Sequence, residues 1–380
     1  MKVEKLSNTI DIKRYLEELG VDGGGVGILA NKAKTHIISI KGLNVGGANI
    51  LKQDALSIGA DLAVPRGTVL AITPEVDTLL IATSAQLKVL AKKELAQPFG
   101  LKELALKLKE YTQIKTPKKV QIMGVINANN DSFFASSRFQ NAAAIEMIDN
   151  MIQEGATIID IGGVSSAPNA AIVSAEEELS RIKPIADLIK KQKLYDKVRF
   201  SIDSYEPLVI EYALNAGFSI VNDIRGLESD EVCRVAAKYK ASVVIMHMQG
   251  RPQNMQDNPQ YGDVLSEVYE FLEMRVHKAE SFGIEDIIID VGIGFGKTLE
   301  DNLKLIKNLE HFMTLGKPLL VGASRKSMID KIVSTKVEDR LSGTITLHLE
   351  AVKNGASILR VHDVSEHKQA LKVQEALLKV

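Results

Sequence analysis

The sequence predicts an α/β protein in which a (β/α)8 TIM barrel follows a smaller N-terminal α/β domain. After residue 117, eight short apolar runs alternate with segments of helical spacing, over roughly 260 residues, which is close to the usual size of this barrel. The runs are rich in Ile and Val without regular alternation, as expected of parallel strands buried on both faces. Most runs end in Asn, Asp, Arg or Lys, and polar side chains at the carboxyl ends of the strands form the catalytic rim of such a barrel.

Residues 1–116 are expected to form the smaller domain and residues 117–380 the barrel, with the basic stretch around Pro117 as the boundary. In the first domain the spacing predicts helices at 11–19, 85–95 and 101–111 and strands at 36–40 and 79–82. Gly25, Gly27 and Ala30 fit a dinucleotide-binding fingerprint loosely, but that motif requires a preceding strand. The glycine run is therefore interpreted as a surface turn, and the sequence assigns no function to residues 1–116.

The barrel strands are expected at 120–126, 158–161, 198–202, 219–221, 242–246, 287–289, 318–321 and 357–359. Helices are expected between them at 142–154, 175–192, 265–281 and 299–309. The glycine-rich stretch 292–298 ends like a nucleotide P-loop, but Val291 stands where the leading glycine is required. Its glycines are instead expected to shape a loop that lets Asp290 face a ligand.

Composition narrows the class of protein and its location. Lys and Arg number 47 against 48 Asp and Glu, without the basic excess of a nucleic-acid-binding protein. Cys233 is the single cysteine, so no internal disulfide forms, which fits a reducing compartment. The N-terminus has no apolar signal region, and no run is long and apolar enough to cross a bilayer. We therefore expect a cytoplasmic protein with neither nucleic acid nor membrane as a partner.

Four of the strand-end residues suit a flat heterocycle. Taken singly, Asp203 or Asn222 is as well explained as a helix N-cap. Together with Asp290 and Lys326 on one rim, they offer acceptors and donors above an apolar floor, as a ring with several N–H groups and a carbonyl requires. A buried carboxylate facing an amidine-like ring edge forms paired, charge-assisted hydrogen bonds.

A second set of residues suits an anion. Ser165 and Ser166 adjoin two glycines, where backbone N–H groups can approach a phosphate. Arg360 and His362 are two residues apart, so their side chains leave on the same side. His362 alone would be read as structural, but beside Arg360 diphosphate binding is favoured. Asn127 can offer a neutral oxygen to Mg²⁺, which commonly shares substrate phosphates.

Several motifs occur in the order found in one enzyme family. They lie at 123–127 with 131–133, 160–163, 201–203, 221–224, 246–250, 292–297, 324–327 and 360–364. The chain resembles the dihydropteroate synthases, pterin-binding enzymes of folate biosynthesis, over residues 118–380. The resemblance implies a transferase that condenses (7,8-dihydropterin-6-yl)methyl diphosphate with 4-aminobenzoate, needs Mg²⁺ and is a sulfonamide target. It also implies a homodimer.

The resemblance assigns roles residue by residue. The implied pterin-binding residues are Asp203, Asn222, Asp290 and Lys326. The implied diphosphate-binding residues are Asn127, which is also the metal ligand, Ser166, Arg360 and His362. Phe133, Pro168, Ser324 and Arg325 would border 4-aminobenzoate. The implied catalytic residues are Asp131, Lys326, Arg360 and His362.

The chain departs from the family pattern in two loops. It has Ala128, Asn129 and Asn130 where the family has Thr-Pro, and residues 164–168 where the family has Glu-Ser-Thr-Arg-Pro. Ala167 thus removes a charge from the second loop, whereas Ser166 keeps the hydroxyl. Two alternatives remain: a methyltetrahydrofolate methyltransferase of the same superfamily, which needs no diphosphate pocket, and a barrel that binds a pterin without catalysis.

Overall fold

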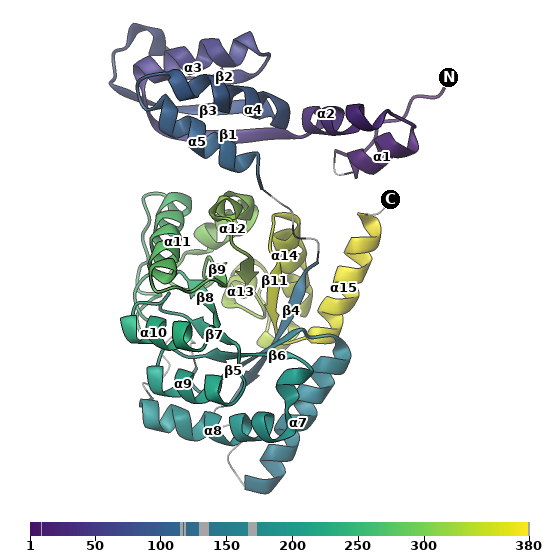
Figure 1. Cartoon of the computed structure of the whole chain (residues 1–380), viewed down its shortest axis with the longest axis vertical. Helices are drawn as coiled ribbons and strands as arrows, with labels where there is room; N and C mark the ends of the chain where they lie inside the picture. The colour runs from purple at the N-terminus through teal and green to yellow at the C-terminus, as the bar shows by residue number, and fades with distance from the viewer. Residues whose placement is uncertain (9, 115–116, 118, 129–136, 166–172, 379–380) are drawn as a thin grey trace. The chain divides into compact units, whose positions relative to one another are not determined.

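The computed structural model describes residues 1–8, 10–114, 117, 119–128, 137–165 and 173–378, with the backbone alone at 137–142. The chain divides into two compact units (Figure 1). One consists of Met1–Lys115 with Glu375–Val380, and the other of Thr116–Gln374. Each unit has its own hydrophobic core.

The N-terminal unit packs helices on one face of a small antiparallel sheet. Its elements are α1 (Ile12–Glu18), α2 (Gly23–Ala33), β1 (Thr35–Asn44), α3 (Val45–Ser57), β2 (Asp61–Ala63), β3 (Glu75–Thr83), α4 (Ser84–Lys93) and α5 (Leu101–Tyr111). The strand order is β1-β3-β2. Along β3, buried and exposed side chains alternate, so one face of the sheet contributes Leu80 and Ala82 to the core shared with α3, α4 and α5.

The predicted surface turn at the glycine run is wrong, because residues 23–33 form helix α2. Asp22 caps it, since its side-chain Oδ1 accepts a hydrogen bond from the Gly24 N–H at 2.9 Å. Val26 and Ala30, four residues apart, are buried on one face of the helix. Helix α1 precedes this segment, so the strand that a dinucleotide fingerprint requires is absent at that place.

One buried carboxyl makes the stability of this unit depend on pH. Glu94, in the 3-10 turn Glu94–Ala96 that follows α4, is fully buried. Burial, and then the nearby Asp54 carboxylate, raise the pKa of its carboxyl from 4.5 to about 7. Because this folded-state pKa exceeds the unfolded value, the folded chain binds more protons between about pH 4.5 and pH 7. The free energy of unfolding therefore falls as pH rises through that window.

We expect Glu94→Gln to reduce this loss of stability, because the amide carries no charge to be buried. Denaturant unfolding at pH 5 and pH 8 checks this, with the variant losing less stability than the parent between the two values. Glu103→Gln on the exposed side of α5 is the control and should keep the parent's pH dependence. An identical dependence in the parent and in Glu94→Gln would contradict the assignment.

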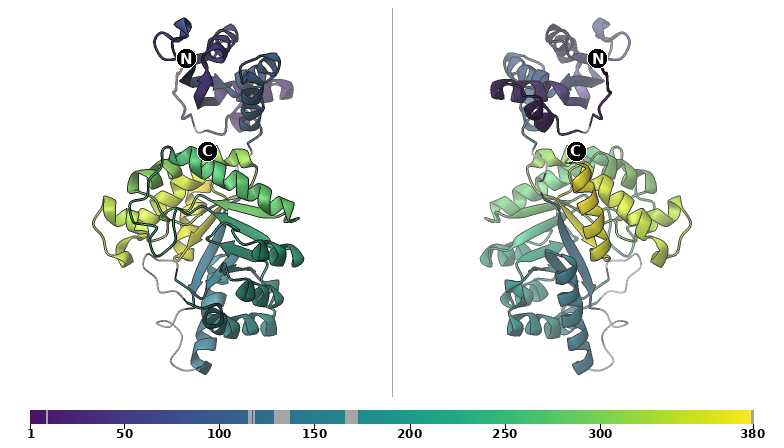
Figure 2. Two further views of the ribbon diagram at one scale, coloured as in Figure 1. Left: turned by 90° about the vertical axis from the view of Figure 1, so that its left-hand side faces the viewer. Right: turned by 90° about the vertical axis from the view of Figure 1, so that its right-hand side faces the viewer.

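The second unit is a closed barrel of eight parallel strands, as the sequence predicts (Figure 2). The strands are β4 (Gln121–Asn127), β5 (Ile158–Gly162), β6 (Arg199–Asp203), β7 (Ile220–Asp223), β8 (Ser242–Met246), β9 (Ile287–Asp290), β10 (Leu319–Val321) and β11 (Ile358–Val361). Their order around the barrel is β10-β11-β4-β5-β6-β7-β8-β9. Each neighbouring pair is parallel.

Helices follow the strands and cover the outside of the barrel (Figures 1 and 2). They are α7 (Ser137–Glu154), α8 (Ala175–Gln192), α9 (Pro207–Asn215), α10 (Asp230–Lys238), α11 (Val264–Ser281), α12 (Leu299–Lys307), α13 (Ser327–Ile332), α14 (Leu341–Lys353) and α15 (Val364–Leu377). The main core lies between these helices and the outer faces of the strands.

A separate layer of seven buried apolar side chains forms one cluster with a member from each of seven strands. Its members are Met123, Ile158, Ile220, Val244, Ile288, Leu320 and Ile358. Side chains two positions apart on a strand point to the same side. The next residues on that side, toward the carboxyl ends of the strands, are Asp160, Asn222, Asp290 and Arg360, with Asp203 of β6 at the same level. Strand geometry alone thus places a polar layer on an apolar floor.

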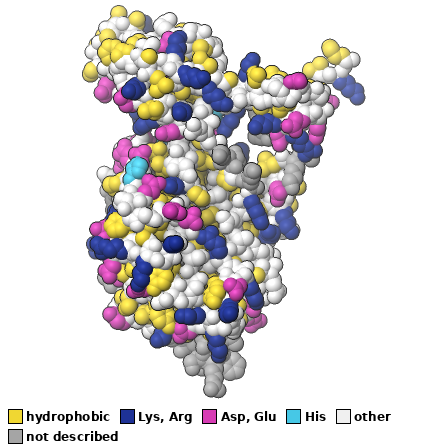
Figure 3. Space-filling view, viewed as in Figure 1, with side chains coloured by type: hydrophobic (Ala, Val, Ile, Leu, Met, Phe, Trp, Pro, Cys, Tyr) yellow, Lys and Arg dark blue, Asp and Glu magenta, His cyan; other side chains and the backbone are white. Residues whose placement is uncertain are grey.

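The surface shows no large region of a single charge on the face seen in Figure 3, where basic and acidic side chains are interspersed over the barrel. Within the described ranges, the helices include none with both the length and the apolar character needed to cross a membrane.

Candidate active site

The polar layer is organised around Arg360 of β11. Its guanidinium Nε donates to Asp160 Oδ2 at 2.7 Å, and its terminal NH2 nitrogen donates to Asp203 Oδ2, also at 2.7 Å. Asn222 Nδ2 donates to the same Asp160 oxygen at 3.1 Å. We call these four residues the Arg360 network. Strands β5, β6, β7 and β11 each contribute one member, so the network exists only because the barrel brings these strand ends together.

Two carboxyl groups and one cation meet in this network, and the pKa of the Asp203 carboxyl is shifted. Burial raises the pKa of Asp203 to about 7, Arg360 opposes the rise, and Asp160 and Glu178 add to it. Burial would lower the pKa of the Arg360 guanidinium, but the Asp160 and Asp203 carboxylates together raise it above its ordinary value. Arg360 therefore stays charged, while Asp203 is poised to change charge near neutral pH. A ligand edge rich in N–H groups would favour the ionised carboxylate.

Asp290 and Lys326 form the neighbouring part of the rim. Burial raises the pKa of Asp290, whose Oδ1 accepts a hydrogen bond from the Gly292 N–H at 2.7 Å. Burial lowers the pKa of Lys326 to about 7, against the opposing effect of Asp290. The Lys326 ammonium donates to the carbonyl of Ile293 and lies 4.0 Å from the centroid of the Phe295 ring.

The glycines after β9 permit this arrangement. Gly294 has φ +83°, and a Cβ there would lie 2.8 Å from Cδ of Lys326. Gly292 has φ +69°, and a Cβ there would lie 1.8 Å from the His247 carbonyl oxygen. A side chain at either position would be strained and would displace its neighbour. The loop therefore shapes the site around Asp290, as expected from the sequence.

Lys297 is turned into the protein rather than toward a phosphate. Its fully buried ammonium contacts His247 Nδ1 at 2.9 Å and donates to the carbonyl oxygens of Gly292 and Phe295, each at 3.0 Å. Burial lowers the pKa of Lys297 to about 7 and, with the nearby lysine, that of His247 to about 2. Through these contacts Lys297 connects the loop after β9, which holds Gly292 and Phe295, to His247 in the loop after β8.

The loops after β10 and β11 are joined by two polar contacts. Ser324 Oγ lies 2.9 Å from His362 Nδ1. The Arg325 guanidinium holds the Asp363 carboxylate through two nitrogens, at 3.0 and 2.5 Å. The hydrogen bond from Arg325 lowers the pKa of the Asp363 carboxyl. These contacts place a hydroxyl, an imidazole and a guanidinium beside one another at the rim.

The structure brings most of the predicted site residues to this rim. Asp203, Asn222 and Arg360 share the Arg360 network, Asp290 and Lys326 lie beside the loop after β9, and Ser324, Arg325 and His362 join the last two loops. Asn127 is exposed at the end of β4. Predicted residues Asp131, Phe133, Ser166 and Pro168 lie outside the described residues. The alternative role of Asp203 as a helix cap fails, because the N-cap of α9 is Glu206.

Sequence reasoning left two residues of the rim out of the predicted site. Asp160 is fully buried at the centre of the Arg360 network, and its signal was a charged residue inside an apolar strand run. Asp363 orients Arg325, and it directly follows the predicted His362. Asp160 could have been predicted from the sequence, since a carboxylate inside a buried strand needs a charged or hydrogen-bonding partner.

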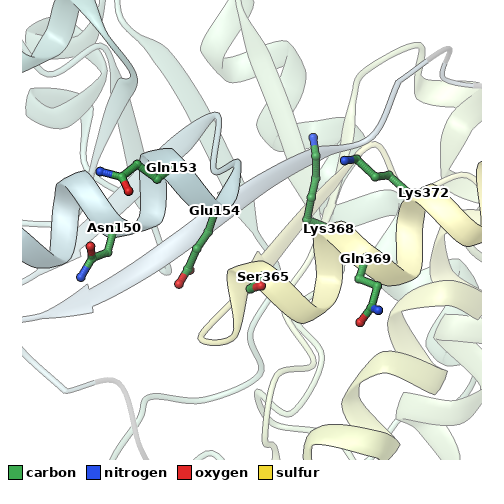
Figure 4. A pocket seen from close by; sticks show the side chains of 7 residues that line it. All are labelled: Asn150, Gln153, Glu154, Ser365, Lys368, Gln369 and Lys372. Atoms are coloured by element: carbon green, nitrogen blue, oxygen red, sulfur yellow. The ribbon is translucent and has the colours of Figure 1, made fainter.

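Hollows between helices lie on the outside of the barrel rather than at this rim, and two of them are the following. One, of about 650 Å³, lies between α7 and α15 and is lined by polar side chains that include Glu154 and Lys368 (Figure 4). The other, of about 950 Å³, lies between α12 and α14. Neither is lined by a residue of the polar layer, so the rim stays the candidate site.

Carboxylates, an amide and cations that converge on the carboxyl rim of a closed parallel barrel define a (β/α)8-barrel enzyme site for a polar ring. A family model described as pterin binding enzyme matches residues 123–362. Since the match covers more than half of the chain and includes the whole described polar layer, this chain belongs to the pterin-binding enzyme family.

Individual relatives narrow the likeness to one kind of pterin-binding enzyme. The chain is 42% identical over 375 residues to a bifunctional dihydropteroate synthase/dihydropteroate reductase of Helicobacter pylori, with 99% of each chain covered. It is 43% identical over 259 residues to the dihydropteroate synthase of Haemophilus influenzae, with 67% of this chain and 93% of the relative covered.

Solved structures agree with the sequence relatives. A dihydropteroate synthase of Yersinia pestis in a sulfonamide complex matches with a TM-score of 0.64 at 35% identity, over 69% of this chain and 95% of that one. A dihydropteroate synthase of Xanthomonas albilineans with 4-aminobenzoic acid matches with a TM-score of 0.64 at 36% identity, over 69% and 94%.

Proposed function

We propose that the barrel is a dihydropteroate synthase, which condenses (7,8-dihydropterin-6-yl)methyl diphosphate with 4-aminobenzoate in folate biosynthesis. The observation that carries this is the polar layer above the apolar floor, in a chain whose relatives carry that name. In the reaction the exocyclic C–O bond to diphosphate breaks, a C–N bond to the aryl amine forms, and the amine loses a proton. The products are 7,8-dihydropteroate and diphosphate.

The pterin would be held by the residues of the rim that face one another across the floor. Asp203 and Asp290 would accept hydrogen bonds from ring N–H groups, and Lys326 would donate to a ring acceptor. Because these groups are withdrawn from water, each hydrogen bond to a charged partner is worth about 1.5–3 kcal/mol. The aryl amine is a neutral nucleophile near pH 7, so the reaction needs no strong base.

The leaving diphosphate would lie near Arg360 and His362, where charge accumulates as the C–O bond breaks. No group of three or more His, Cys, Asp or Glu suited to a metal occurs among the described residues. Asn127 would offer one neutral oxygen, and the substrate phosphates would supply most of the other ligands of the ion. Mg²⁺ would supply charge neutralisation on the diphosphate. Ser324 and Arg325 would border 4-aminobenzoate and its sulfonamide mimics.

Purified protein with Mg²⁺ and both substrates should release diphosphate and form dihydropteroate, and sulfonamides should compete with 4-aminobenzoate. A methyltransferase would instead need a methyl acceptor and ignore 4-aminobenzoate, whereas a binding-only barrel would hold the pterin and release nothing. Absence of diphosphate release at saturating substrates would reject the synthase. A homodimer in the cytoplasm is the assembly and location expected of it, and sedimentation of the purified protein tests the former.

A second activity, reduction of dihydropteroate, is proposed for residues 1–116. The observation is that the bifunctional relative covers 99% of this chain, whereas the Haemophilus influenzae synthase covers 67%. The N-terminal unit is therefore shared with a relative whose name includes a reductase. Adding two electrons and two protons requires a hydride donor such as a reduced nicotinamide or flavin. Full-length protein given dihydropteroate and each donor in turn should form tetrahydropteroate, detected by mass; no product with any donor would refute the proposal.

A further inference from the structure

Two histidines behind the rim are buried and hydrogen-bonded to each other. His348 of α14 and His367 of α15 are 0% and 1% exposed, and His348 Nδ1 lies 2.8 Å from His367 Nε2. We call them the histidine pair. Neither touches the Arg360 network through a hydrogen bond, and the proposed reaction gives them no role.

The outer nitrogens of the pair reach the two loops at the rim. The Ala323 N–H donates to His348 Nε2 at 3.0 Å, next to Ser324. At the other end, His367 Nδ1 lies 2.6 Å from the Asp363 carbonyl oxygen. The Asp363 carboxylate in turn holds Arg325. The pair therefore links the main chain of the loop after β10 to the main chain of the loop after β11.

One arrangement of protons satisfies every contact. Because the Ala323 N–H is a donor, His348 Nε2 must accept, so the proton of neutral His348 is on Nδ1. That proton is donated to His367 Nε2, which leaves the proton of His367 on Nδ1, where the Asp363 carbonyl accepts it. A proton added to His348 would place an N–H group opposite the Ala323 N–H, and one added to His367 would place an N–H group opposite His348 Nδ1–H. Both rings are therefore neutral and have one fixed tautomer each.

Burial keeps both rings of the pair neutral. Burial lowers the pKa of His348, and His367, Lys326 and His362 lower it further. Burial also lowers the pKa of His367, against the opposing effects of Asp363 and Glu366. The hydrogen-bond directions above thus persist through the neutral pH range.

We propose that His348 and His367 are positioning residues, whose hydrogen-bonded pair holds the Ala323–Arg325 segment in the geometry that binds the aryl amine substrate. The inference rests on the proposed function, because Ser324 and Arg325 are there assigned to 4-aminobenzoate. The segment needs such support, since Arg325 has a left-handed φ of 55°, which a branched or long side chain adopts reluctantly. Thr344 supplies a second support, since its Oγ1 accepts the Arg325 N–H at 2.9 Å.

The first measurement is hydrogen exchange in the full-length protein. His348→Leu removes the hydrogen bonds of His348 to the Ala323 N–H and to His367 and fills the space with an apolar side chain of similar size. The amides of residues 322–326 should therefore exchange at least tenfold faster. Leu272→Ala, which opens a cavity on the fully buried face of α11, is the control for general loss of stability and should leave this segment protected. Unchanged exchange at 322–326 in His348→Leu would overturn the positioning role.

The second measurement separates substrate positioning from folding. The KM for 4-aminobenzoate should rise about tenfold in His348→Leu, as expected when the loop after β10 loses the buried hydrogen bond from the Ala323 N–H, while kcat changes less than threefold. His348→Gln restores an acceptor for the Ala323 N–H and should return KM toward the parent value. The double variant His348→Leu/His367→Leu should equal the worse single variant, because the two rings act through each other.

The outcomes distinguish the two proposals. A rise in KM that Leu272→Ala reproduces, or single effects that multiply in the double variant, would overturn the histidine pair as a positioning device. A parent protein that forms no dihydropteroate would overturn the proposed function. The exchange result would then still decide whether the pair orders the segment.

Discussion

Arg360→Ala should lower kcat for dihydropteroate formation by on the order of 10²–10³. Two effects combine in this expectation. The leaving diphosphate loses its guanidinium, and Asp160 and Asp203 lose the cation that bonds both of them at 2.7 Å. Because Asp160 is fully buried, leaving it without that partner should also lower the free energy of unfolding by about 3 kcal/mol.

Steady-state kinetics at saturating substrates, with diphosphate release as the signal, measures the first effect. Calorimetric binding of a dihydropterin that lacks the diphosphate should weaken less than kcat falls, since the substrate group missing from this ligand is the proposed partner of Arg360. Arg360→Lys is the matched control: it keeps the charge but lacks the fork that spans two carboxylates, so it should recover stability only in part. A kcat within tenfold of the parent in Arg360→Ala would remove this residue from the reaction.

Affinity for the dihydropterin should pass through a maximum near pH 7. Asp203, with a pKa raised to about 7, must be ionised to accept from the ring, so affinity falls as the pH drops below that value. Lys326, with a pKa lowered to about 7, must be protonated to donate as a cation, so affinity falls as the pH rises above it. The two limbs together give a bell-shaped profile.

Each limb should vanish with its own substitution. Asp203→Asn removes the acid limb and Lys326→Met the alkaline limb, and each weakens binding about 10- to 100-fold at pH 7. Calorimetry from pH 5.5 to 8.5 measures both, and His277→Gln on the surface of α11, with its side chain 73% exposed, should leave the profile unchanged. A profile in the parent that is flat across this range would show that neither group titrates in the site.

The barrel and the position of its rim could be predicted because apolar runs of strand length alternate with helical segments, and most of these runs end in polar residues. Several strands continue one or two residues beyond their apolar runs, and the residues two positions beyond the apolar floor, such as Asn222 and Asp290, are by geometry on the inner face. The sequence does not show which rim residues bond to one another. Arg360 meets partners 200 and 157 positions away in the chain, and only closure of the barrel selects Asp160 and Asp203.

The failures in the N-terminal unit have a different cause. Helix α2 begins with three glycines, which disfavour a helix, and the Asp22 cap with the burial of Val26 and Ala30 overrides that preference. Helix α3 has glycines at its second and third positions, and β2 is three residues long, so neither shows a clear periodic signal. The histidine pair was equally invisible, since nothing in the sequence relates positions 348 and 367.

The layer of seven apolar side chains beneath the polar rim also bears on the order in which the proposed substrates would bind. Because these side chains fill the interior of the barrel over the described strands, substrates and products share the mouth at the carboxyl rim. In the proposed placement, a pterin on that floor would lie below a molecule at the Ser324–Arg325 loop. We therefore expect the pterin to bind first and an inhibitor in the outer position to hinder its release. Inhibition by such a molecule should deepen, rather than fade, as the pterin concentration rises.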